Sequence, residues 1–328
     1  MGENRRVVGV VGGGQLCLLL GQEARRKGLP CDLIAVDPTG DCPALPVLRR
    51  HILGDCKDPD ALLRLVDAAD IVTVECAQPD SAALENLEQR RKAVYPSGAT
   101  LRLVQDKVLL KSKGLPVAES RPAEVAVEIS VIAARSAAGE LRTYPAGENL
   151  FQNGFLVTTI VPARIDPAVA KAAEAVALRT LEALPGAGVF CIEMFVDPKG
   201  EILIKDIAPR VHNSGYYTIE ACRTSQFEQH VRAITGMPLG ETTLLYSAVM
   251  VKILGAPGLQ GPVVLEGVES VRSIPGTFVH LYGRKETAPG RELGHVTLID
   301  VNDSSYRDAL IHRADHVRRM IVQKEARR

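Results

Sequence analysis

The stretch RRVVGVVGGGQLCLLLGQEARRKG, residues 5–28, decides the fold of this chain. Residues 7–11 form a continuous apolar run, which is typical of a parallel strand covered on both faces. Three glycines at positions 12–14 follow as a turn, and leucines at 16, 19 and 20 then form a helical stripe. Gly28 suits the end of that helix. The stretch therefore predicts a strand, a glycine turn and a helix.

The same alternation continues toward residue 76. CDLIAVDP (31–38) reads as a second strand ending at Asp37, DPDALLRLVDAAD (58–70) as a helix, and DIVTVEC (70–76) as a third strand ending at Glu75. This βαβαβ order predicts a doubly wound parallel sheet that binds ligands at the carboxyl ends of its strands. We expect this domain to span residues 1–96.

The remaining chain has a different pattern. Helices are expected over about 80–92 and 98–113, and residues 97–124 form a helix and a shortened linker. Residues 127–146 and 188–209 read as hairpins, and residues 166–184 as a helix. Strands are expected near 246–254, 277–282 and 294–300, and a last helix over about 305–324. We therefore expect residues 125–328 to form a mostly antiparallel α+β domain.

Composition excludes several classes of protein. The 39 Lys and Arg balance the 39 Asp and Glu, so the chain is not built to bind a nucleic acid polymer non-specifically. No apolar run approaches the roughly 18 residues of a membrane span, and the strand-like start argues against a signal peptide. None of the seven cysteines forms a CxxC pair. Free thiols and a cytoplasmic location are expected.

The glycine turn is the first candidate site. Its backbone N–H groups lie at a helix N-terminus, which suits a phosphate. A dinucleotide fingerprint would need a third glycine at position 17, where Cys17 stands, so a mono-phosphate is favoured. The alternative is a tight turn alone. Glu75 ends the third strand, where it can accept from a ribose hydroxyl or a ring amine; the alternative is a solvated loop acid.

The second candidate site lies on the second hairpin and the loop that follows it. Glu193 and Asp206 are expected opposite each other, and paired carboxylates commonly hold Mg²⁺ on nucleotide phosphates; an exposed polar face is the alternative. In PRVHNSG (209–215), the Arg210 guanidinium suits phosphate or carboxylate, and Asn213 and Ser214 complete an anion cradle. His212 is expected to orient a group or transfer a proton, or else to be a structural hydrogen bonder.

Taken together, these motifs resemble a known family. GGGQL (12–16), QDK (105–107), ISVIAAR (129–135), IEMF (192–195), IAPRVHNSGYYT (207–218) and SQFEQHVRAITGMPL (225–239) match, in order, the ATP-grasp enzyme carboxyaminoimidazole ribonucleotide synthetase. The resemblance runs from about residue 7 to 321, and the pairing of APRVHNSG with SQFEQH is specific to that family. It implies an enzyme that uses MgATP to form carboxyphosphate from bicarbonate and then carboxylates the amine of aminoimidazole ribonucleotide.

The resemblance also implies roles for individual residues, and a homodimer as the expected assembly. Residues carried over for the ribonucleotide are Gly13, Gly14, Gln15, Leu16, Glu75, Arg135, Asn213 and Ser214. Arg210 and His212 are carried over as catalytic, Lys107, Lys205 and Asp206 for ATP, and Glu193 and Asp206 for Mg²⁺.

The chain departs from the family pattern in its ATP-handling parts. After GLP (114–116) the family has a central subdomain with a phosphate-binding lysine and a glycine-rich flap, which the sequence is expected to lack. Without them, water would reach the acyl phosphate and the transferring group would lose charge stabilisation. Single positions differ too: Lys107 replaces an arginine, Phe151 a histidine, Lys205 and Lys252 asparagines, and Glu292 a lysine. Lys205 either mimics or repels the cation beside Asp206.

Three functions stay open from the sequence. The first is the purine-pathway carboxylation of aminoimidazole ribonucleotide with bicarbonate and ATP, by a chain whose ATP-binding parts are degraded. The second is an ATP-independent protein that binds the same or a similar ribonucleotide, either as an enzyme of altered chemistry or as a non-catalytic regulator. The third is a structural partner without ligands. In the first two, the site is expected between the domains, with Gly13, Gly14 and Gln15 facing Arg210, His212, Asn213 and Ser214.

Overall fold

The computed structural model describes residues 5–76, 80–90, 93–300 and 307–326. The N-terminal part is a five-stranded sheet in the order β3-β2-β1-β4-β5, and every strand pair in it is parallel. This confirms the predicted parallel sheet, to which β3 and β5 are additions. The strands are β1 (Arg6–Val11), β2 (Cys31–Asp37), β3 (Leu48–Leu53), β4 (Ile71–Val74) and β5 (Ala93–Tyr95), with α1 (Gln15–Arg26), η1 (Leu45–Val47), α2 (Pro59–Ala68) and α3 (Ser81–Glu88) between them.

Two short helices lead out of this sheet. The prediction of a single helix over 98–113 is wrong, because the structure has two helices there, α4 (Gly98–Gln105) and α5 (Lys107–Ser112). Asp106 separates them: its backbone leaves the helical conformation, and its side chain accepts from the N–H groups of Val108 and Leu109. An aspartate that caps a new helix in this way ends the preceding one. Residues 113–126 then connect to the larger sheet without forming a helix or a named strand.

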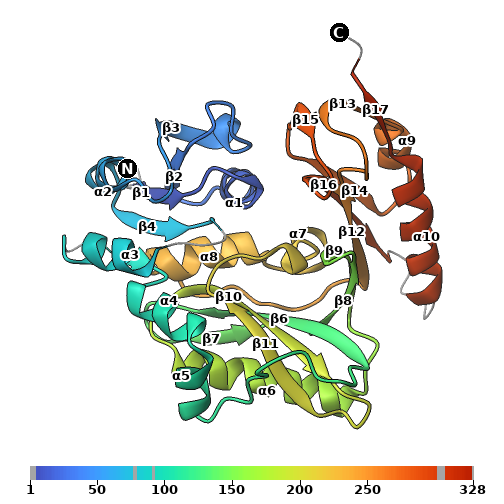
Figure 1. The fold of residues 1–328 in the computed structure, drawn as a ribbon, viewed down its shortest axis with the longest axis horizontal. Coiled ribbons are helices and arrows are strands. Elements are labelled where there is room, and N and C mark those ends of the chain that lie inside the picture. The colour runs from blue at the N-terminus through green and yellow to red at the C-terminus, as the bar shows by residue number, and fades with distance from the viewer. Residues whose placement is uncertain (1–4, 77–79, 91–92, 301–306, 327–328) are drawn as a thin grey trace.

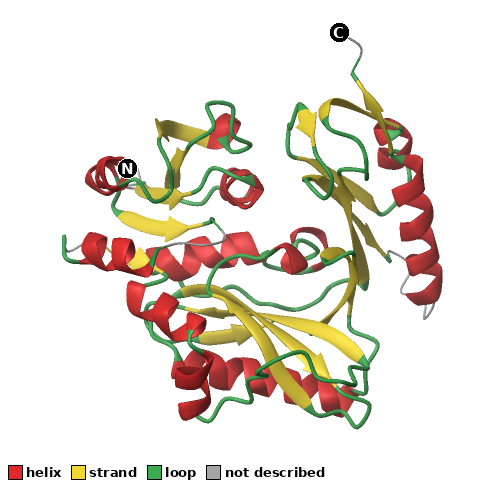
Figure 2. Ribbon diagram, viewed as in Figure 1, coloured by secondary structure: helices red, strands yellow, loops and turns green. Residues whose placement is uncertain are grey.

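The larger sheet has nine strands in the order β11-β10-β6-β8-β9-β12-β16-β14, with β7 pairing β6. It confirms the predicted antiparallel part, and it joins both predicted hairpins to the C-terminal strands through β9 and β12. Figure 2 shows a helix, α6 (Pro167–Ala183), under this sheet. The strands are β6 (Val127–Arg135), β7 (Leu141–Thr143), β8 (Gly147–Gln152), β9 (Phe155–Val161), β10 (Gly188–Val196), β11 (Ile202–Ala208), β12 (Ala248–Leu254), β14 (Thr277–Leu281) and β16 (Glu292–Ile299).

The C-terminus ends in a small sheet. The last helix, expected to reach residue 324, stops at Met320, and residues 322–325 form a strand that pairs with residues 263–266. The Gln323 side chain bonds the backbone of Leu254 and Ala256, which holds this strand in place. The elements are β13 (Gly261–Glu266), α9 (Val268–Arg272), β15 (Glu286–Thr287), α10 (Arg307–Met320) and β17 (Val322–Glu325).

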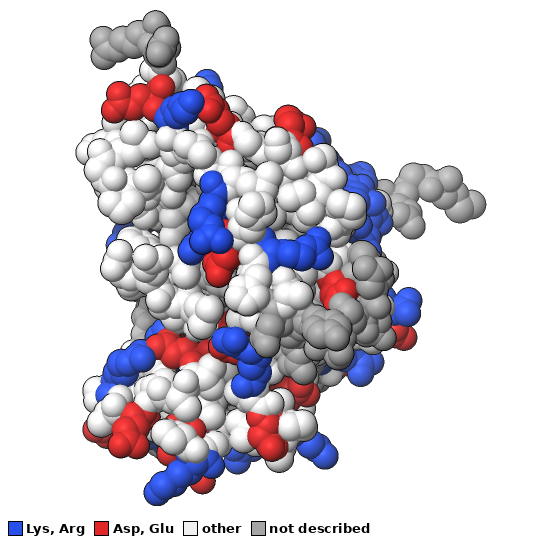
Figure 3. All heavy atoms as spheres, turned by 90° about the vertical axis from the view of Figure 1, so that its right-hand side faces the viewer, with Lys and Arg blue, Asp and Glu red and all other residues white. Residues whose placement is uncertain are grey.

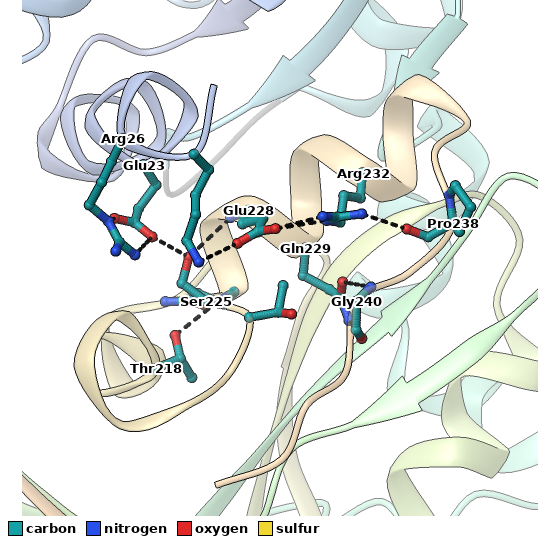
Figure 4. Close-up of polar contacts among 12 residues, drawn as sticks. Glu23, Arg26, Thr218, Ser225, Glu228, Gln229, Arg232, Pro238 and Gly240 are labelled. Atoms are coloured by element: carbon teal, nitrogen blue, oxygen red, sulfur yellow. Dashed lines mark hydrogen bonds and ion pairs between the residues drawn. The ribbon is translucent and has the colours of Figure 1, made fainter. Parts of the chain in front are cut away.

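Helix α8 (Gln226–Thr235), which follows η2 (Asn213–Gly215) and α7 (Thr218–Ala221), lies between the two large sheets (Figure 1). Polar contacts join its first turn to α1, as Figure 4 shows. Ser225 donates to Glu23 at 2.7 Å, and Lys27 pairs with Glu228 at 3.1 Å. One buried apolar cluster also contains residues of α1, β1, α8 and β10. The N-terminal sheet is therefore packed against the larger one through α1 and α8.

The exposed charges are mixed rather than segregated. On the face drawn in Figure 3, Lys and Arg lie among Asp and Glu, as expected for a chain with equal numbers of each. Among the described helices, none combines the length and the apolar composition needed to span a bilayer. The seven cysteines are all free, as predicted.

Candidate functional site

The glycine turn before α1 is occupied by carboxylates of its own chain. The N–H of Gly13 donates to Asp37 Oδ2 at 2.9 Å. Those of Gly14 and Leu16 donate to the two oxygens of Glu75 at 3.3 and 3.2 Å. In this structure the Gly13 and Gly14 N–H groups therefore have carboxylate partners, and their part in phosphate binding stays a prediction. A buried helix N-terminus needs acceptors, and two acidic strand ends already supply them.

The position of the Glu75 carboxylate depends on the glycines at positions 12 and 14. A Cβ on Gly14 would lie 2.5 Å from Glu75 Oε1, and one on Gly12, whose φ is +109°, would lie 2.6 Å from Oε2. Burial raises the pKa of Glu75, although the Arg210 guanidinium acts in the opposite direction. Glu75 is therefore a partly buried capping residue, and the interpretation as a solvated loop acid does not hold.

Gln15 points from the turn toward the C-terminal strands. Its Nε2 lies 3.3 Å from Glu292 Oε2, and its Oε1 accepts from Arg284 Nη2 at 3.1 Å. From the other side, Asn213 Nδ2 lies 3.4 Å from Glu292 Oε1, and the Tyr216 hydroxyl 3.4 Å from Oε2. The structure thus brings Gln15 and Asn213 to one place, as expected. The carboxylate between them was not predicted as a site residue.

Glu292 also forms an ion pair with Lys252, whose side chain is buried. Burial lowers the pKa of Lys252, and the neighbouring Glu292 counteracts that shift. Both positions depart from the family pattern, and they lie on the paired strands β12 and β16. The sequence signal for this ion pair was that positions 252 and 292 both depart from the family pattern, one to a lysine and the other to a glutamate.

The loop at 210–214 is held rigidly by the first turn of α8. Gln226 accepts from the backbone N–H of His212 at 3.0 Å and donates to its carbonyl at 2.6 Å. The His212 Nδ1 lies 2.9 Å from Ser214 Oγ. Burial, and next the nearby Arg210, hold the pKa of His212 well below its usual range. His212 is therefore a neutral imidazole near neutral pH, and its part in proton transfer stays a prediction.

The acidic pair on the second hairpin is present. Glu193 on β10 lies opposite Asp206 on β11, as predicted. However, Lys205 Nζ lies 3.0 Å from Glu128 Oε2 and 4.0 Å from Glu193 Oε2. Within the described part of the chain, no three His, Cys, Asp or Glu side chains are grouped so that they would hold a metal ion. Mg²⁺ binding by Glu193 and Asp206, which the resemblance implies, stays a prediction, and the Lys205 ammonium lies beside the pair.

Two further predicted residues have other contacts. Lys107 Nζ donates to the carbonyls of Ala118 and Glu119 at 2.9 and 3.3 Å, beside a cavity of about 240 Å³ that Asp206 and Arg210 also line. Arg135, predicted to bind the ribonucleotide, instead donates to the carbonyls of Leu181 and Leu184 at 3.1 and 2.7 Å. It caps the end of α6, because the last carbonyls of a helix lack partners within it. Arg135 is therefore not brought together with the other site residues.

Comparison with known protein families matches three consecutive segments of the chain. Residues 5–105 match the ribonucleotide synthetase preATP-grasp domain, residues 102–227 the ATP-grasp domain, and residues 248–309 the phosphoribosylaminoimidazole carboxylase C-terminal domain. The ATP-grasp match extends across the stretch where the central subdomain was expected to be missing. The expectation that this subdomain is wholly absent is therefore not supported.

Individual relatives cover nearly the whole chain. The N5-carboxyaminoimidazole ribonucleotide synthases of Bacillus subtilis and Brucella melitensis are 31% and 33% identical over 89% of this chain. The two alignments cover 91% of the B. subtilis protein and 96% of the B. melitensis protein. The phosphoribosylaminoimidazole carboxylase of Ogataea methanolica is 31% identical over 90% of this chain, which spans 66% of that longer protein. The B. subtilis alignment runs over 354 positions, more than the 328 residues here, so that relative contains residues without a counterpart in this chain.

Solved structures agree with these matches. The N5-carboxyaminoimidazole ribonucleotide synthetase of Thermotoga maritima is 34% identical and superposes with a TM-score of 0.88, covering 98% of this chain and 100% of its own. The synthase of Aspergillus clavatus in complex with ADP and 5-aminoimidazole ribonucleotide is 26% identical with a TM-score of 0.85, covering 96% and 99%. The fold is therefore the ATP-grasp architecture, and the chain belongs to the N5-carboxyaminoimidazole ribonucleotide synthase family.

Proposed function

We propose that this chain acts on 5-aminoimidazole ribonucleotide in purine biosynthesis, carboxylating its amine with bicarbonate at the expense of ATP. The observation that carries the proposal is the meeting of Gln15, from the glycine turn, with Asn213, from the loop after β11, at Glu292. Family membership supports the reaction, and the A. clavatus relative was crystallised with this ribonucleotide and ADP. The ribonucleotide is placed where these three segments meet.

Unsatisfied polar atoms support this placement. Among the described residues, Arg284 Nε and Asn213 Oδ1 are buried and lack a hydrogen-bond partner. Buried polar groups in native proteins nearly always have partners, so these atoms suit contact with a ligand or with water. Because Asp37 and Glu75 occupy the glycine N–H groups, the guanidinium groups of Arg210 and Arg284 are the expected partners of the ribonucleotide phosphate.

A second candidate function is ribonucleotide binding without ATP turnover. The short connection at residues 113–126 and the longer alignment of the B. subtilis relative both favour a reduced central subdomain. A reduced subdomain would close less completely over an acyl phosphate, which needs protection from water. The two candidates share the ribonucleotide site and differ in the need for ATP.

Thermal unfolding with 5-aminoimidazole ribonucleotide and with ATP, each added separately, tests both candidates. A ligand that binds only the folded state raises the melting temperature. We expect the ribonucleotide to stabilise the protein, and phosphate release from ATP to require both ribonucleotide and bicarbonate. Stabilisation by the ribonucleotide without phosphate release would select the second candidate. No stabilisation by the ribonucleotide would contradict both.

A matched pair of variants on α1 tests the placement. Gln15→Leu removes the side chain that links Arg284 to Glu292, whereas Gln22→Leu changes the same residue type at an exposed position of the same helix. We expect Gln15→Leu to weaken ribonucleotide affinity about tenfold, the loss of a hydrogen bond to a charged group, and Gln22→Leu to leave it unchanged. Equal affinity in the two variants would show that the ribonucleotide binds elsewhere.

A further inference from the structure

We propose that the Lys205 ammonium takes the place of a divalent cation beside Glu193 and Asp206, so that this acidic pair binds no metal ion. The inference concerns a site beside the proposed ribonucleotide position. It does not depend on whether the carboxylation proposed above takes place.

The backbone of β11 brings the Lys205 side chain to this face. Glu193 pairs with Asp206 and Met194 with Ile204, so Lys205 is an extra residue in β11. Such a β-bulge redirects a side chain and is common beside functional sites. Ile204 and Ile207 both enter one apolar cluster. Lys205 and Asp206 lie between these two isoleucines in the chain. Their side chains therefore lie on the other face of the sheet, which also carries Glu193.

The ammonium is held from several sides. Its Nζ lies 3.0 Å from Glu128 Oε2 and 4.0 Å from Glu193 Oε2. It also lies 4.3 Å from the centre of the Phe151 ring and 5.9 Å from that of Phe195. Carboxylates and ring faces are the groups that hold a lysine cation. The side chain is thus an ordered part of the site.

Three of the carboxylates around this point, Glu128, Glu148 and Glu193, have a cation from the chain itself. Glu128 also pairs with Arg121, and Glu148 with Arg164 at 2.6 Å. A metal ion on Glu193 would lie within a few ångströms of the Lys205 ammonium, in a partly buried place where like charges repel strongly. The geometry thus disfavours Mg²⁺ where the sequence predicted it.

The ammonium faces an open cavity. Lys205, Arg121, Glu128, Asn149 and Phe151 are among the residues that line a space of about 530 Å³. An anionic group entering this cavity would meet the lysine directly instead of a bound metal. Lys205 therefore supplies positive charge as a fixed side chain.

Titration with MnCl₂, followed by the electron paramagnetic resonance signal of free Mn²⁺, tests the inference on the intact protein. We expect the wild type to show no saturable site up to millimolar Mn²⁺. Lys205→Asn removes the ammonium and leaves Glu128, Glu193 and Asp206, so it should create a site at least about tenfold tighter than any in the wild type. Adding Glu193→Gln to Lys205→Asn should abolish that site.

Controls separate this effect from a general change of charge. Lys199→Asn removes one positive charge from the turn of the same hairpin and should create no site. If Lys205→Asn does not fold, Lys205→Met keeps the apolar stem on Phe151 and tests the same point. Saturable Mn²⁺ binding by the wild type that Glu193→Gln removes would overturn the inference, as would unchanged Mn²⁺ binding in the folded Lys205 variants.

Discussion

Glu292 is the central residue of the proposed site. It faces the side chains of Gln15, Asn213 and Tyr216 while it pairs with the buried Lys252. A buried ion pair adds little net stability by itself, but the removal of one partner leaves an uncompensated buried charge. Lys252 and Glu292 should therefore behave as one unit.

Substitution of Lys252 tests this unit. We expect Lys252→Met to lower the free energy of unfolding by about 3 kcal/mol or more, because Glu292 loses its buried counter-charge, and Lys252→Met with Glu292→Met to recover most of the loss. Urea unfolding measures both. Lys324→Met breaks the exposed pair with Glu266 and should cost less than about 1 kcal/mol. Additive losses in the double variant would show that the two residues are not coupled.

At the scale of one element, the start of α1 depends on acceptors from neighbouring strands. The helix has no side-chain cap of its own at Gly14. Glu75, at the end of β4, accepts from the N–H groups of Gly14 and Leu16 instead. The absence of a Cβ at Gly14 is what lets the carboxylate approach. The glycine turn therefore serves helix capping in this structure, although its pattern is also that of a phosphate loop.

Gly14→Ala tests the capping. The new Cβ would lie 2.5 Å from Glu75 Oε1, so the carboxylate must move and two N–H groups lose their acceptor. We expect a loss of about 1–3 kcal/mol in the free energy of unfolding, measured with urea. Gly40→Ala, where a Cβ meets nothing within 4 Å, should change it by less than about 0.5 kcal/mol. Equal stability of the two variants would contradict the capping role of Glu75.

At the scale of the whole molecule, α8 holds the two large sheets together. His230 accepts from the N–H of Val189 on β10 at 3.1 Å through Nδ1, and its Nε2 lies 2.8 Å from the Thr73 hydroxyl on β4. Nε2 therefore carries the proton and donates to Thr73. Together with the contacts of Ser225 and Glu228 in Figure 4, this makes the SQFEQH motif a connection between domains.

His230 contributes to the pH dependence of stability, in the same direction as His212 and His295, whose pKa values burial also lowers. Burial lowers the pKa of His230 to about 4, whereas an unfolded histidine titrates near pH 6.5. Between these values the unfolded chain binds more protons, so this contribution is complete above about pH 6.5 and is lost as pH falls toward 4. We expect a loss of up to about 3 kcal/mol by urea unfolding across this window. His230→Asn should flatten the dependence; an unchanged slope in that variant would assign it to other groups.

Local patterns determined much of this architecture. The apolar runs and the glycine turn predicted the parallel sheet, because strand and helix periods are properties of short segments. The DPKG turn (197–200) predicted the hairpin that brings Glu193 and Asp206 onto neighbouring strands, although the β-bulge at Lys205 is what sets these two residues opposite each other. The sequence also marked Gln15 and Asn213 as residues that meet, through motifs that are distant along the chain.

The partners of the polar groups were decided only by the tertiary structure. Asp37 and Glu75 occupy the glycine N–H groups, Arg135 caps α6, and Lys205 reaches Glu128 across the sheet. Each of these contacts joins residues far apart in the sequence, and each donor had several acceptors of the right chemistry to choose from. The strand order of each sheet, and the packing of α6 on the larger sheet, select one of them, because a buried polar group must bond whatever the fold places beside it.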